Sequence, residues 1–372
     1  MSLLTRTRRW AVVATVAASA AVAVAPGAVA APPAYGKAAA QAAVTALVSQ
    51  QRAMGSSAFL FGSGADWSVH AGAVSGQENR PIGDRDHFRI GSLTKMYVST
   101  VVLQLVGEGK LALDTGFGAY LPGLATGTTN DDTKITVRHL LQHTTGIAEY
   151  LNVMVALPTN WWRTYDVTAH AKSGLSHGSQ FAPGSKYSYS NTNYIILGLI
   201  IEKLTGRPVA QEIAERILIP HGLAGTGLQN AGQQLMPAPY VTGYVAVPFV
   251  PVRIDSRSQD PTMAWAAGAM YSTATDTAKF LDLLLGGKLL PPALLTEMKT
   301  PLPGGFYGLG LSTYELPCGV RVYGHNGAIP GYLTFGFRAE NGRKAVVLTS
   351  VTPAEEPRVK LASDAVAAVV CS

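Results

Sequence analysis

Apolar and polar residues alternate with a different period in different parts of the chain. At the N-terminal side, "AAAQAAVTALVSQQRAM" has the period of a helix, and "SSAFLFGSGADWSVHAGAVSG" has strand-like runs joined by glycine turns. Beyond Tyr307, strand-like runs return in "YGLGLSTYEL", "VRVYGHNGAI", "YLTFGFRAE" and "KAVVLTSVT", and a helical period follows in "EPRVKLASDAVAAVVC". The pattern therefore predicts strands near both ends of the chain, with a helix outside each set.

The middle of the chain is mainly helical in pattern. An amphipathic helix is predicted from about Thr94 to Val106, directly after the strand-like "FRI", and Gly107 and Gly109 end it. Further helices are predicted in "TVRHLLQH", "VTAHAKSG" and "NTNYIILGLIIEKLTG". A short strand or turn, and then a helix capped near Thr275, is predicted in "WAAGAMYSTATDTAKFLDLLLGG".

Consecutive hairpins of this kind imply a largely antiparallel sheet. We expect an α/β (α+β) fold in which residues 31–91 and 265–372 build the sheet and the terminal helices that flank it. Residues 92–264 would form a mostly helical inserted region. The active site is expected between these two regions.

The first 30 residues have the layout of a secretory signal. Arg6, Arg8 and Arg9 precede an apolar run from Trp10 to Ala25, and "AVA" supplies small residues for cleavage after Ala30. A retained membrane anchor is the alternative, but the run is short for a span, which needs about 20 residues. We expect export with cleavage, which makes the mature protein secreted and free of the membrane.

Composition narrows the class of protein. Formal charge falls from +6 to +3 when the signal is removed, because three arginines and no acids leave with it. No basic run remains, so nucleic-acid binding has little support. The 47% hydrophobic and 14% charged residues are typical of a well-packed globular enzyme, as one large or two intimate domains.

Cys318 and Cys371 are the only cysteines in the sequence. In an exported protein two cysteines can pair, and this pair would join the end of the chain to the segment before "YGHNG". Two separate buried thiols are the alternative.

The sequence "SLTK" places the hydroxyl of Ser92 and the amine of Lys95 three residues apart, on one face of the predicted helix. Ser92 would lie at the helix N-terminus, whose free N–H groups and partial positive charge suit an oxygen that becomes negative during acyl transfer. A buried lysine with a lowered pKa can accept the serine proton. A capping serine with a solvent-facing lysine is the alternative, since S-x-x-K is common by chance.

Two further motifs follow in the order that this chemistry needs. "YSN" at Tyr189–Asn191 begins 97 residues after Ser92, and "HNG" at His325–Gly327 begins 136 residues after Tyr189. By itself "YSYSN" is also typical of a helix start. Three motifs in sequence are far more specific than any one of them.

With these motifs the protein resembles the serine penicillin-recognising enzymes, which include serine β-lactamases and DD-peptidases. The Y-x-N motif is similar to that of class C β-lactamases and their carboxypeptidase and esterase relatives, and the likeness covers most of residues 40–372. It includes "FRIGSLTKMYVSTVVLQLVGEGKLALD", "ITVRHLLQHTTGI", "PGSKYSYSNTNYIILGLIIEKLTG" and "YGHNGAIPGY". The histidine of "HNG" and the positions of Cys318 and Cys371 resemble secreted soluble D-alanyl-D-alanine carboxypeptidases.

The resemblance implies a β-lactamase/transpeptidase-like fold and a role for each motif. Ser92 would become acylated, Lys95 would help to deprotonate it, and Tyr189, as a phenolate or in a shared-proton network, would be the base and later the acid. A phenolate needs nearby positive charge, from Lys95 and a protonated His325. Asn191 would hold the substrate amide.

The third motif implies the rest of the site. His325, Asn326 and Gly327 would bind substrate, and Gly327 would let the substrate backbone lie along the strand. The backbone N–H groups of Ser92 and Ala328 would form the oxyanion hole.

The sequence differs from this family pattern at three places. Asn326 stands where threonine is usual, and Ala328 lacks a hydroxyl that many relatives carry. Carboxypeptidase relatives can carry an arginine after the Y-G-L-G stretch, whereas Ser312 and Thr313 follow it here and the next basic residue is Arg321. Part of the clamp for a substrate carboxylate is therefore missing.

We expect a monomeric secreted serine hydrolase that needs no cofactor and no metal. The expected substrates are cell-wall peptides that end in D-Ala-D-Ala, cleaved by a carboxypeptidase or transpeptidase, with β-lactams as covalent ligands at Ser92. A β-lactamase, an esterase or a D-amino-acid amidase on the same scaffold is the first alternative. An inactive penicillin- or wall-binding protein is the second.

Two other features of the sequence have simpler explanations. His139 and His143 stand four residues apart, as a metal pair can, but no H-E-x-x-H glutamate lies between them. Trp161, Trp162 and Tyr150 could line a substrate cleft, and packing within the helical region explains them at least as well.

Overall fold

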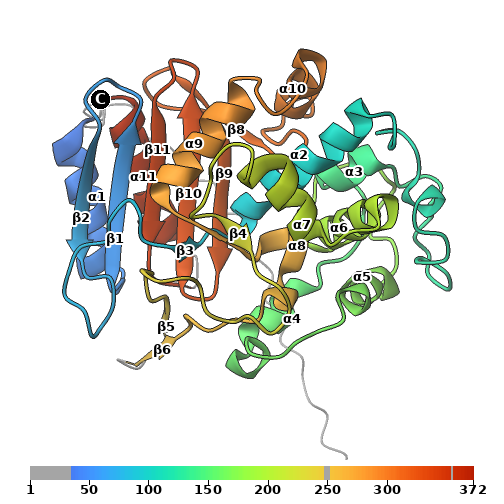
Figure 1. Ribbon diagram of the computed structural model, residues 1–372, viewed down its shortest axis with the longest axis horizontal. Helices are drawn as coiled ribbons and strands as arrows, with labels where there is room; N and C mark the ends of the chain where they lie inside the picture. Colours follow the sequence, from blue (N-terminus) through green and yellow to red (C-terminus); the bar gives the residue numbers. More distant parts are fainter. Residues whose placement is uncertain (1–34, 247–251, 353–354) are drawn as a thin grey trace, which may run out of the picture. The chain divides into compact units, whose positions relative to one another are not determined.

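A six-stranded antiparallel sheet runs through the folded part of the protein (Figure 1). The computed structural model describes residues 35–246, 252–352 and 355–372, so the predicted signal segment 1–30 lies outside the described residues. The strand order is β2-β1-β11-β10-β9-β8. The strands are β1 (Gly55–Phe61), β2 (Trp67–Gly72), β8 (Ser312–Glu315), β9 (Arg321–Ile329), β10 (Tyr332–Ala339) and β11 (Lys344–Thr349).

Helices α1 (Lys37–Ser49) and α11 (Glu356–Val370) cover one face of the sheet. The alternation of side chains in β11 shows how the two faces are built. Ala345 and Val347 join the core under α1 and α11, while Val346 and Leu348 join the larger core on the other face. All four side chains are buried, so β11 is an interior strand packed on both faces.

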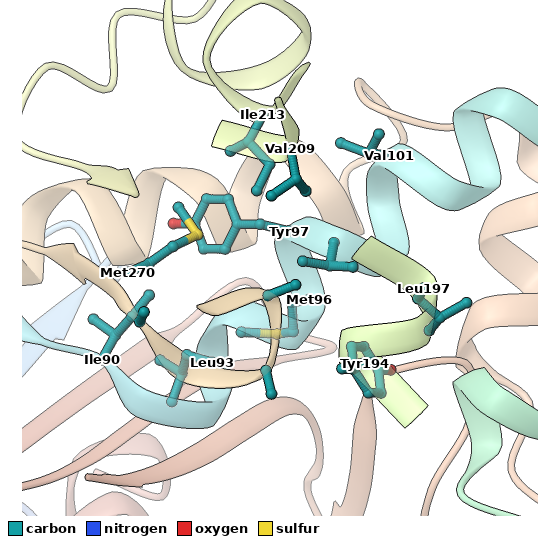
Figure 2. Close-up of a cluster of buried hydrophobic side chains, with 14 of the residues drawn as sticks. Ile90, Leu93, Met96, Tyr97, Val101, Tyr194, Leu197, Val209, Ile213 and Met270 are labelled. Carbon is teal, nitrogen blue, oxygen red and sulfur yellow. The ribbon is translucent and has the colours of Figure 1, made fainter. Parts of the chain in front are cut away.

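The larger core contains α9 (Ala274–Leu285), which packs on β10 and β11, and the helical region beside it. At its centre is α2 (Thr94–Gly107), surrounded by α6 (Thr192–Thr205), α7 (Val209–Ile213) and α8 (Trp265–Gly268). Figure 2 shows Met96, Tyr97 and Val101 of α2 among side chains from these neighbours. Tyr97 also stacks on Phe280 of α9, with ring centroids 3.7 Å apart.

The prediction that α2 is amphipathic is wrong. Every residue from Thr94 to Leu103 is buried, because other elements enclose the helix on all sides. Several of its polar side chains bond inside the protein. Thr94 Oγ1, for example, donates to the carbonyl of Gly91.

The remaining elements are short. The other helices are α3 (Val137–Gln142), α4 (Leu151–Ala156), α5 (Val167–Ser176), α10 (Pro292–Lys299), a π turn at Ala214–Leu218, and 3-10 turns at Gly91–Leu93, Phe117–Ala119, Pro158–Asn160 and Pro261–Met263. Two small sheets join β3 (Phe88–Arg89), β7 (Met270–Ser272) and β4 (Gly227–Leu228), and β5 (Tyr244–Ala246) with β6 (Arg253–Asp255). Among the residues described, none of the helices is both long and apolar enough to cross a membrane.

The predicted α/β (α+β) class with a largely antiparallel sheet and flanking terminal helices is confirmed. The strand predicted in "YGLGLSTYEL" is shorter than expected, because Gly310 has a φ of 80° and the backbone turns there before β8 begins at Ser312. Residues 34–372 form one compact unit. The boundaries proposed at residues 91 and 265 stay a prediction.

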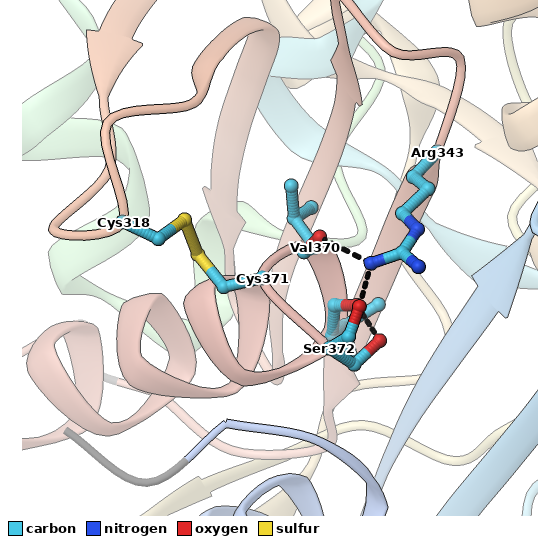
Figure 3. The surroundings of a disulfide bond; sticks show 6 residues. Cys318, Arg343, Val370, Cys371 and Ser372 are labelled. Atoms are coloured by element: carbon cyan, nitrogen blue, oxygen red, sulfur yellow. Dashed lines mark hydrogen bonds between the residues drawn. A yellow bond between two sulfur atoms is a disulfide. The ribbon is translucent and has the colours of Figure 1, made fainter.

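Cys318 and Cys371 form a disulfide bond, with Cα atoms 6.1 Å apart (Figure 3). Two separate thiols, the alternative left open by the sequence, are excluded. The bond joins the turn between β8 and β9 to the residue after α11. Arg343 holds the same end of the protein by donating to the carbonyls of Val370 and Ser372.

Candidate active site

Ser92 lies in a tight turn between β3 and α2. The 3-10 turn Gly91–Leu93 changes the direction of the backbone, and Gly91 has a φ of 54° that favours glycine. A Cβ on Gly91 would also lie 2.9 Å from the backbone nitrogen of Ala328 in β9. The turn therefore presses Ser92 and the start of α2 directly against β9.

The structure brings the predicted catalytic side chains into contact. Tyr189 Oη donates a hydrogen bond to Ser92 Oγ at 2.8 Å, and Lys95 Nζ lies 3.3 Å from the same oxygen. Lys95 Nζ also donates to Asn191 Oδ1 at 2.7 Å and to the carbonyl of Ala267 at 2.6 Å. Tyr189 and Lys95 thus converge on the Ser92 hydroxyl, while Asn191 and Ala267 of α8 hold the Lys95 amine.

Lys95 is fully buried beneath this site. Burial lowers the pKa of Lys95 from 10.5 to about 7, and the negative charge of Glu149 opposes the shift without cancelling it. Its Nζ lies 4.9 Å from the ring centroid of Tyr189 and 5.1 Å from that of Tyr194. At neutral pH a large fraction of Lys95 is therefore uncharged and able to accept a proton.

Of the two states considered for Tyr189, a phenolate and a shared-proton network, the phenolate does not fit the structure. Burial raises the pKa of Tyr189 well above 10, and its hydrogen bond to Ser92 only partly offsets that effect. The phenol is therefore protonated in the resting site, where it acts as a donor to Ser92 Oγ. Desolvation of the charged form is the main cause of the shift, and the negative charge of Glu149 adds to it.

A protonated His325 is also wrong. Burial and the charge of Lys95 lower the pKa of His325 to about 3, so its ring is neutral. The ring is 3% exposed, and its Nε2 lies 2.9 Å from Tyr307 Oη. Neither His325 nor Tyr307 therefore brings positive charge to Tyr189.

The strand β9 carries Asn326, Gly327 and Ala328 past the Ser92 turn. A Cβ on Gly327 would lie 2.0 Å from the carbonyl oxygen of Ile90 and 2.9 Å from the backbone nitrogen of Ser92. Contact within the protein therefore already requires glycine here, before any contact with substrate. The backbone nitrogens of Ser92 and Ala328 both belong to this close junction, and their function as an oxyanion hole stays a prediction.

Asn191 occupies the N-cap position of α6, but its amide group does not cap the helix. Its Oδ1 accepts from Lys95, and its Nδ2 donates to Glu149 Oε2 at 2.9 Å. The backbone N–H of Asn191 donates to the same Glu149 oxygen at 2.7 Å. A helix does start directly after "YSYSN", but the Asn191 side chain does not cap it, because its amide links a lysine to a carboxylate.

Glu149 was not identified from the sequence. Its Oε2 holds Asn191, and its Oε1 accepts from the backbone N–H of Leu151 at 2.6 Å. The only available signal was one acid in the apolar stretch "GIAEY", in a sequence with few charges. That signal does not place the carboxylate beside a motif 42 residues later.

His143 is a second residue that sequence reasoning missed as part of the site. It is buried, its φ of 58° is left-handed, and its ring centroid lies 4.2 Å from that of Tyr189. Its Nδ1 faces donors from Ser190 and Asn193, and burial lowers its pKa. A neutral aromatic ring therefore packs against Tyr189.

His139 does not join His143 as a metal pair. Its backbone N–H and Nδ1 form a reciprocal capping box with Thr136 at the start of α3. Within the described ranges, no group of three or more histidine, cysteine, aspartate or glutamate residues could hold a metal ion.

Ser92 opens into a cleft of about 890 Å³. Glu149, Trp161 and residues of α4 line it, as do the aromatic residues Tyr187, Phe306 and Tyr314. Of the aromatic residues proposed for a cleft, Trp161 lines it, whereas Trp162 and Tyr150 are absent from its described lining.

Comparison with known proteins shows which proteins the chain resembles. The model of the family described as Beta-lactamase matches residues 40–369. A D-stereospecific amidohydrolase from Streptomyces sp. has a similar structure, with 32% identity and a TM-score of 0.80 over 88% of this chain and 98% of that one. A D-amino acid amidase from Ochrobactrum anthropi SV3, complexed with L-phenylalanine amide, has 27% identity and a TM-score of 0.77 over 90% and 97% of the two chains.

A curated relative, the putative penicillin-binding protein PbpX of Bacillus subtilis (strain 168), is 28% identical over 304 residues. The match covers 77% of this chain and 70% of that protein. These relatives share one fold and differ in the reactions that their names describe.

Proposed function

The chain belongs to the Beta-lactamase family of serine hydrolases, and we propose that it cleaves amides and small peptides of D-amino acids through an acyl-enzyme at Ser92. The observation that carries this proposal is the charge of the cleft. Glu149 lines it together with Ser92, and no arginine or lysine is among the described residues that line it. The cleft therefore suits a substrate with a cationic end.

Glu149 is suited to bind the α-ammonium group of such a substrate. The hydrogen bonds that it accepts come from neutral donors, the N–H groups of Leu151 and Asn191 and the side-chain amide of Asn191. A substrate ammonium would complement the carboxylate with a charge-assisted bond. The solved relatives named D-stereospecific amidohydrolase and D-amino acid amidase support the same substrate class.

A D-alanyl-D-alanine carboxypeptidase or transpeptidase is the second candidate. The curated relative named as a putative penicillin-binding protein favours it, as do Ser312 and Asn326, whose polar side chains line the cleft and could bind a carboxylate. The substrate of a carboxypeptidase carries a free carboxylate on its leaving group, which a cation would complement. Without that cation the amidohydrolase is the better supported function.

The proposed acylation uses the contacts that surround Ser92. Neutral Lys95 takes the Ser92 proton while Oγ bonds to the substrate carbonyl, and the N–H groups of Ser92 and Ala328 bind the oxyanion. Tyr189 then gives its phenolic proton to the departing nitrogen as the C–N bond breaks. The proton on Lys95 restores the phenol, and water attacks the ester in the reverse sense to release the D-amino acid.

A substrate panel tests the proposal. Purified protein is assayed on D-alaninamide, L-alaninamide, N-acetyl-D-alaninamide and an acyl-D-Ala-D-Ala peptide, together with a chromogenic cephalosporin and a p-nitrophenyl ester. We expect the highest kcat/KM on D-alaninamide and none in Ser92→Ala. Fast cleavage of acyl-D-Ala-D-Ala with no turnover of D-alaninamide would establish the second candidate instead, and cephalosporin turnover would indicate a β-lactamase.

The Glu149→Gln variant tests the ammonium site itself. We expect kcat/KM on D-alaninamide to fall roughly 10- to 100-fold, the effect of losing a hydrogen bond to a charged group. N-acetyl-D-alaninamide, which has no ammonium group, serves as the control substrate. Equal losses on both amides would mean that Glu149 acts only by holding Asn191.

An inactive binding protein is tested by covalent labelling. A fluorophosphonate or a penicillin should add one adduct to Ser92, seen by intact mass, and Ser92→Ala should stay unlabelled. If the folded protein forms no adduct with either probe, the result would support the alternative of an inactive binding protein.

We also propose that the protein is exported and cleaved after Ala30. The disulfide between Cys318 and Cys371 supports an oxidising compartment. N-terminal sequencing of protein from the culture medium should begin at Ala31, and an intact Met1 would contradict cleavage.

A further inference from the structure

Three aromatic rings form a shelf in the lining of the cleft that also contains Ser92 and Glu149. Tyr187, Phe306 and Tyr314 are 36%, 40% and 38% exposed, and all three line the cleft. Phe306 and Tyr314 stack with centroids 5.4 Å apart, and Tyr187 meets Phe306 edge-on at 5.5 Å. Exposed aromatic rings that gather beside a nucleophile indicate a binding surface for an apolar group.

The aromatic shelf adjoins the proton donor of the proposed reaction. Tyr187 packs on Tyr307 at 5.8 Å, and Tyr307 in turn lies 6.4 Å from Tyr189. A leaving group must lie within reach of the Tyr189 hydroxyl to receive its proton. The shelf is therefore separated from the proton donor by one ring, that of Tyr307.

The acidic and the aromatic residues of the cleft lining have separate partners, since Glu149 bonds to Asn191 and the rings of the shelf pack on one another. If the α-ammonium group of the acyl part is bound at Glu149, the shelf remains as a surface for the leaving group. Burial raises the pKa of Tyr187 and of Tyr314, so the shelf is uncharged at neutral pH. A neutral ring is bound there by aromatic contacts, each worth about 0.5–1.5 kcal/mol.

We propose that the aromatic shelf of Tyr187, Phe306 and Tyr314 is the leaving-group subsite, and that it selects neutral aromatic leaving groups. This inference rests on the proposed function, because it takes Glu149 as the residue that binds the acyl part. The substrates that it assigns to the protein are D-aminoacyl peptides and amides whose departing amine carries an aromatic ring.

Matched peptides test the subsite. The protein should hydrolyse D-Ala-Phe-NH₂ with a kcat/KM at least about 10-fold above that for D-Ala-Gly-NH₂. Phe306→Ala should reduce this ratio to about 1, and Phe306→Leu should restore part of it. Trp162→Ala removes an exposed ring outside the described cleft lining and should keep the wild-type ratio.

A ratio near 1 in the wild type, with D-alaninamide still hydrolysed, would overturn the subsite and leave the proposed function intact. Binding of p-nitroaniline, a neutral aromatic amine, to Ser92→Ala tests the shelf without any turnover. We expect saturable binding that the added Phe306→Ala change weakens at least 5-fold. No saturable binding, or equal binding by both proteins, would overturn the shelf even if no D-aminoacyl substrate is cleaved.

Discussion

The pKa of Lys95 determines how acylation depends on pH. Burial brings it to about 7, below its ordinary value, so the lysine is charged and unable to accept a proton at lower pH. Acylation should therefore rise with pH through a midpoint of about 7. Burst-phase acylation by p-nitrophenyl acetate between pH 5 and 9 measures this, because that ester has no group that ionises in the range.

The titration of His325 does not contribute to this pH profile, because its pKa of about 3 lies below the measured range of pH 5 to 9. In Lys95→Met the residual acylation should be slow, and its rate should no longer rise with pH near pH 7. A flat wild-type profile from pH 5 to 9 would contradict a neutral Lys95 as the proton acceptor.

The protonated phenol of Tyr189 predicts a difference between leaving groups. In Tyr189→Phe, cleavage of D-alaninamide should slow by roughly 10²–10⁴-fold, the usual effect of a lost general acid or base. Acylation by a p-nitrophenyl ester should slow much less, because p-nitrophenolate leaves without a proton. Rapid-quench and burst measurements on both substrates compare the two losses.

Equal losses on the amide and the ester would mean that Tyr189 also takes the proton from Ser92. Near-normal amide cleavage would exclude Tyr189 from proton transfer altogether. Tyr271→Phe is a control, since Tyr271 is absent from the described lining of the cleft and its hydroxyl has no place in the proposed proton path.

At the residue scale, motif order predicted which side chains would meet but not their protonation. Ser92, Lys95 and Tyr189 could be found because each lies in a recognisable motif. The pKa values depend on burial by several elements distant in sequence, which no motif contains. Glu149 was missed for the same reason, since only the fold places it against Asn191.

At the scale of elements, the position of Ser92 depends on the close contact between β9 and the turn that carries Ser92. In Gly327→Ala the new Cβ would meet the Ile90 carbonyl oxygen, a backbone atom that cannot rotate away. The strand and the turn would have to separate, and overpacking of this kind lowers the stability of a protein by about 1–3 kcal/mol or more. We expect a lower Tm and acylation reduced at least about 100-fold, measured by thermal unfolding and penicillin labelling.

Gly107→Ala at the end of α2 is the matched control for this change. Its φ is not positive and the nearest atom to a new Cβ is 3.4 Å away, so stability should hold or rise slightly. If Gly327→Ala acylates Ser92 at the wild-type rate, the contact does not determine the geometry of the site.

Helices and strands were predicted best where the periodicity of their own residues determines them. The 192–205 helix and the strands of the C-terminal sheet follow from their periods. The full burial of α2 does not, because it results from the several partners that surround the helix. The shortening of β8 depends on one left-handed glycine, Gly310, whose conformation the period of the strand does not reveal.

At the scale of the whole molecule, the disulfide joins two distant parts of the folded protein. It closes a loop with a sequence separation of 53 residues, from the β8–β9 turn to the end of α11 (Figure 3). By the chain-entropy relation, a loop of this size restricts the unfolded state by about 4 kcal/mol. In the double variant Cys318→Ser and Cys371→Ser we therefore expect Tm to fall by about 5–10 °C.

The sheet edge and α11 remain packed through their own cores, so the same variant should keep its burst acylation by p-nitrophenyl acetate within about twofold at 20 °C. Reduction of the wild type with dithiothreitol should reproduce the lower Tm, which separates loss of the bond from effects of the two serines. An unchanged Tm in the double variant, with the bond verified by mass in the wild type, would contradict this stabilisation by the disulfide. In that case the disulfide would restrict the unfolded state far less than its loop length implies, as residual structure in that state can cause.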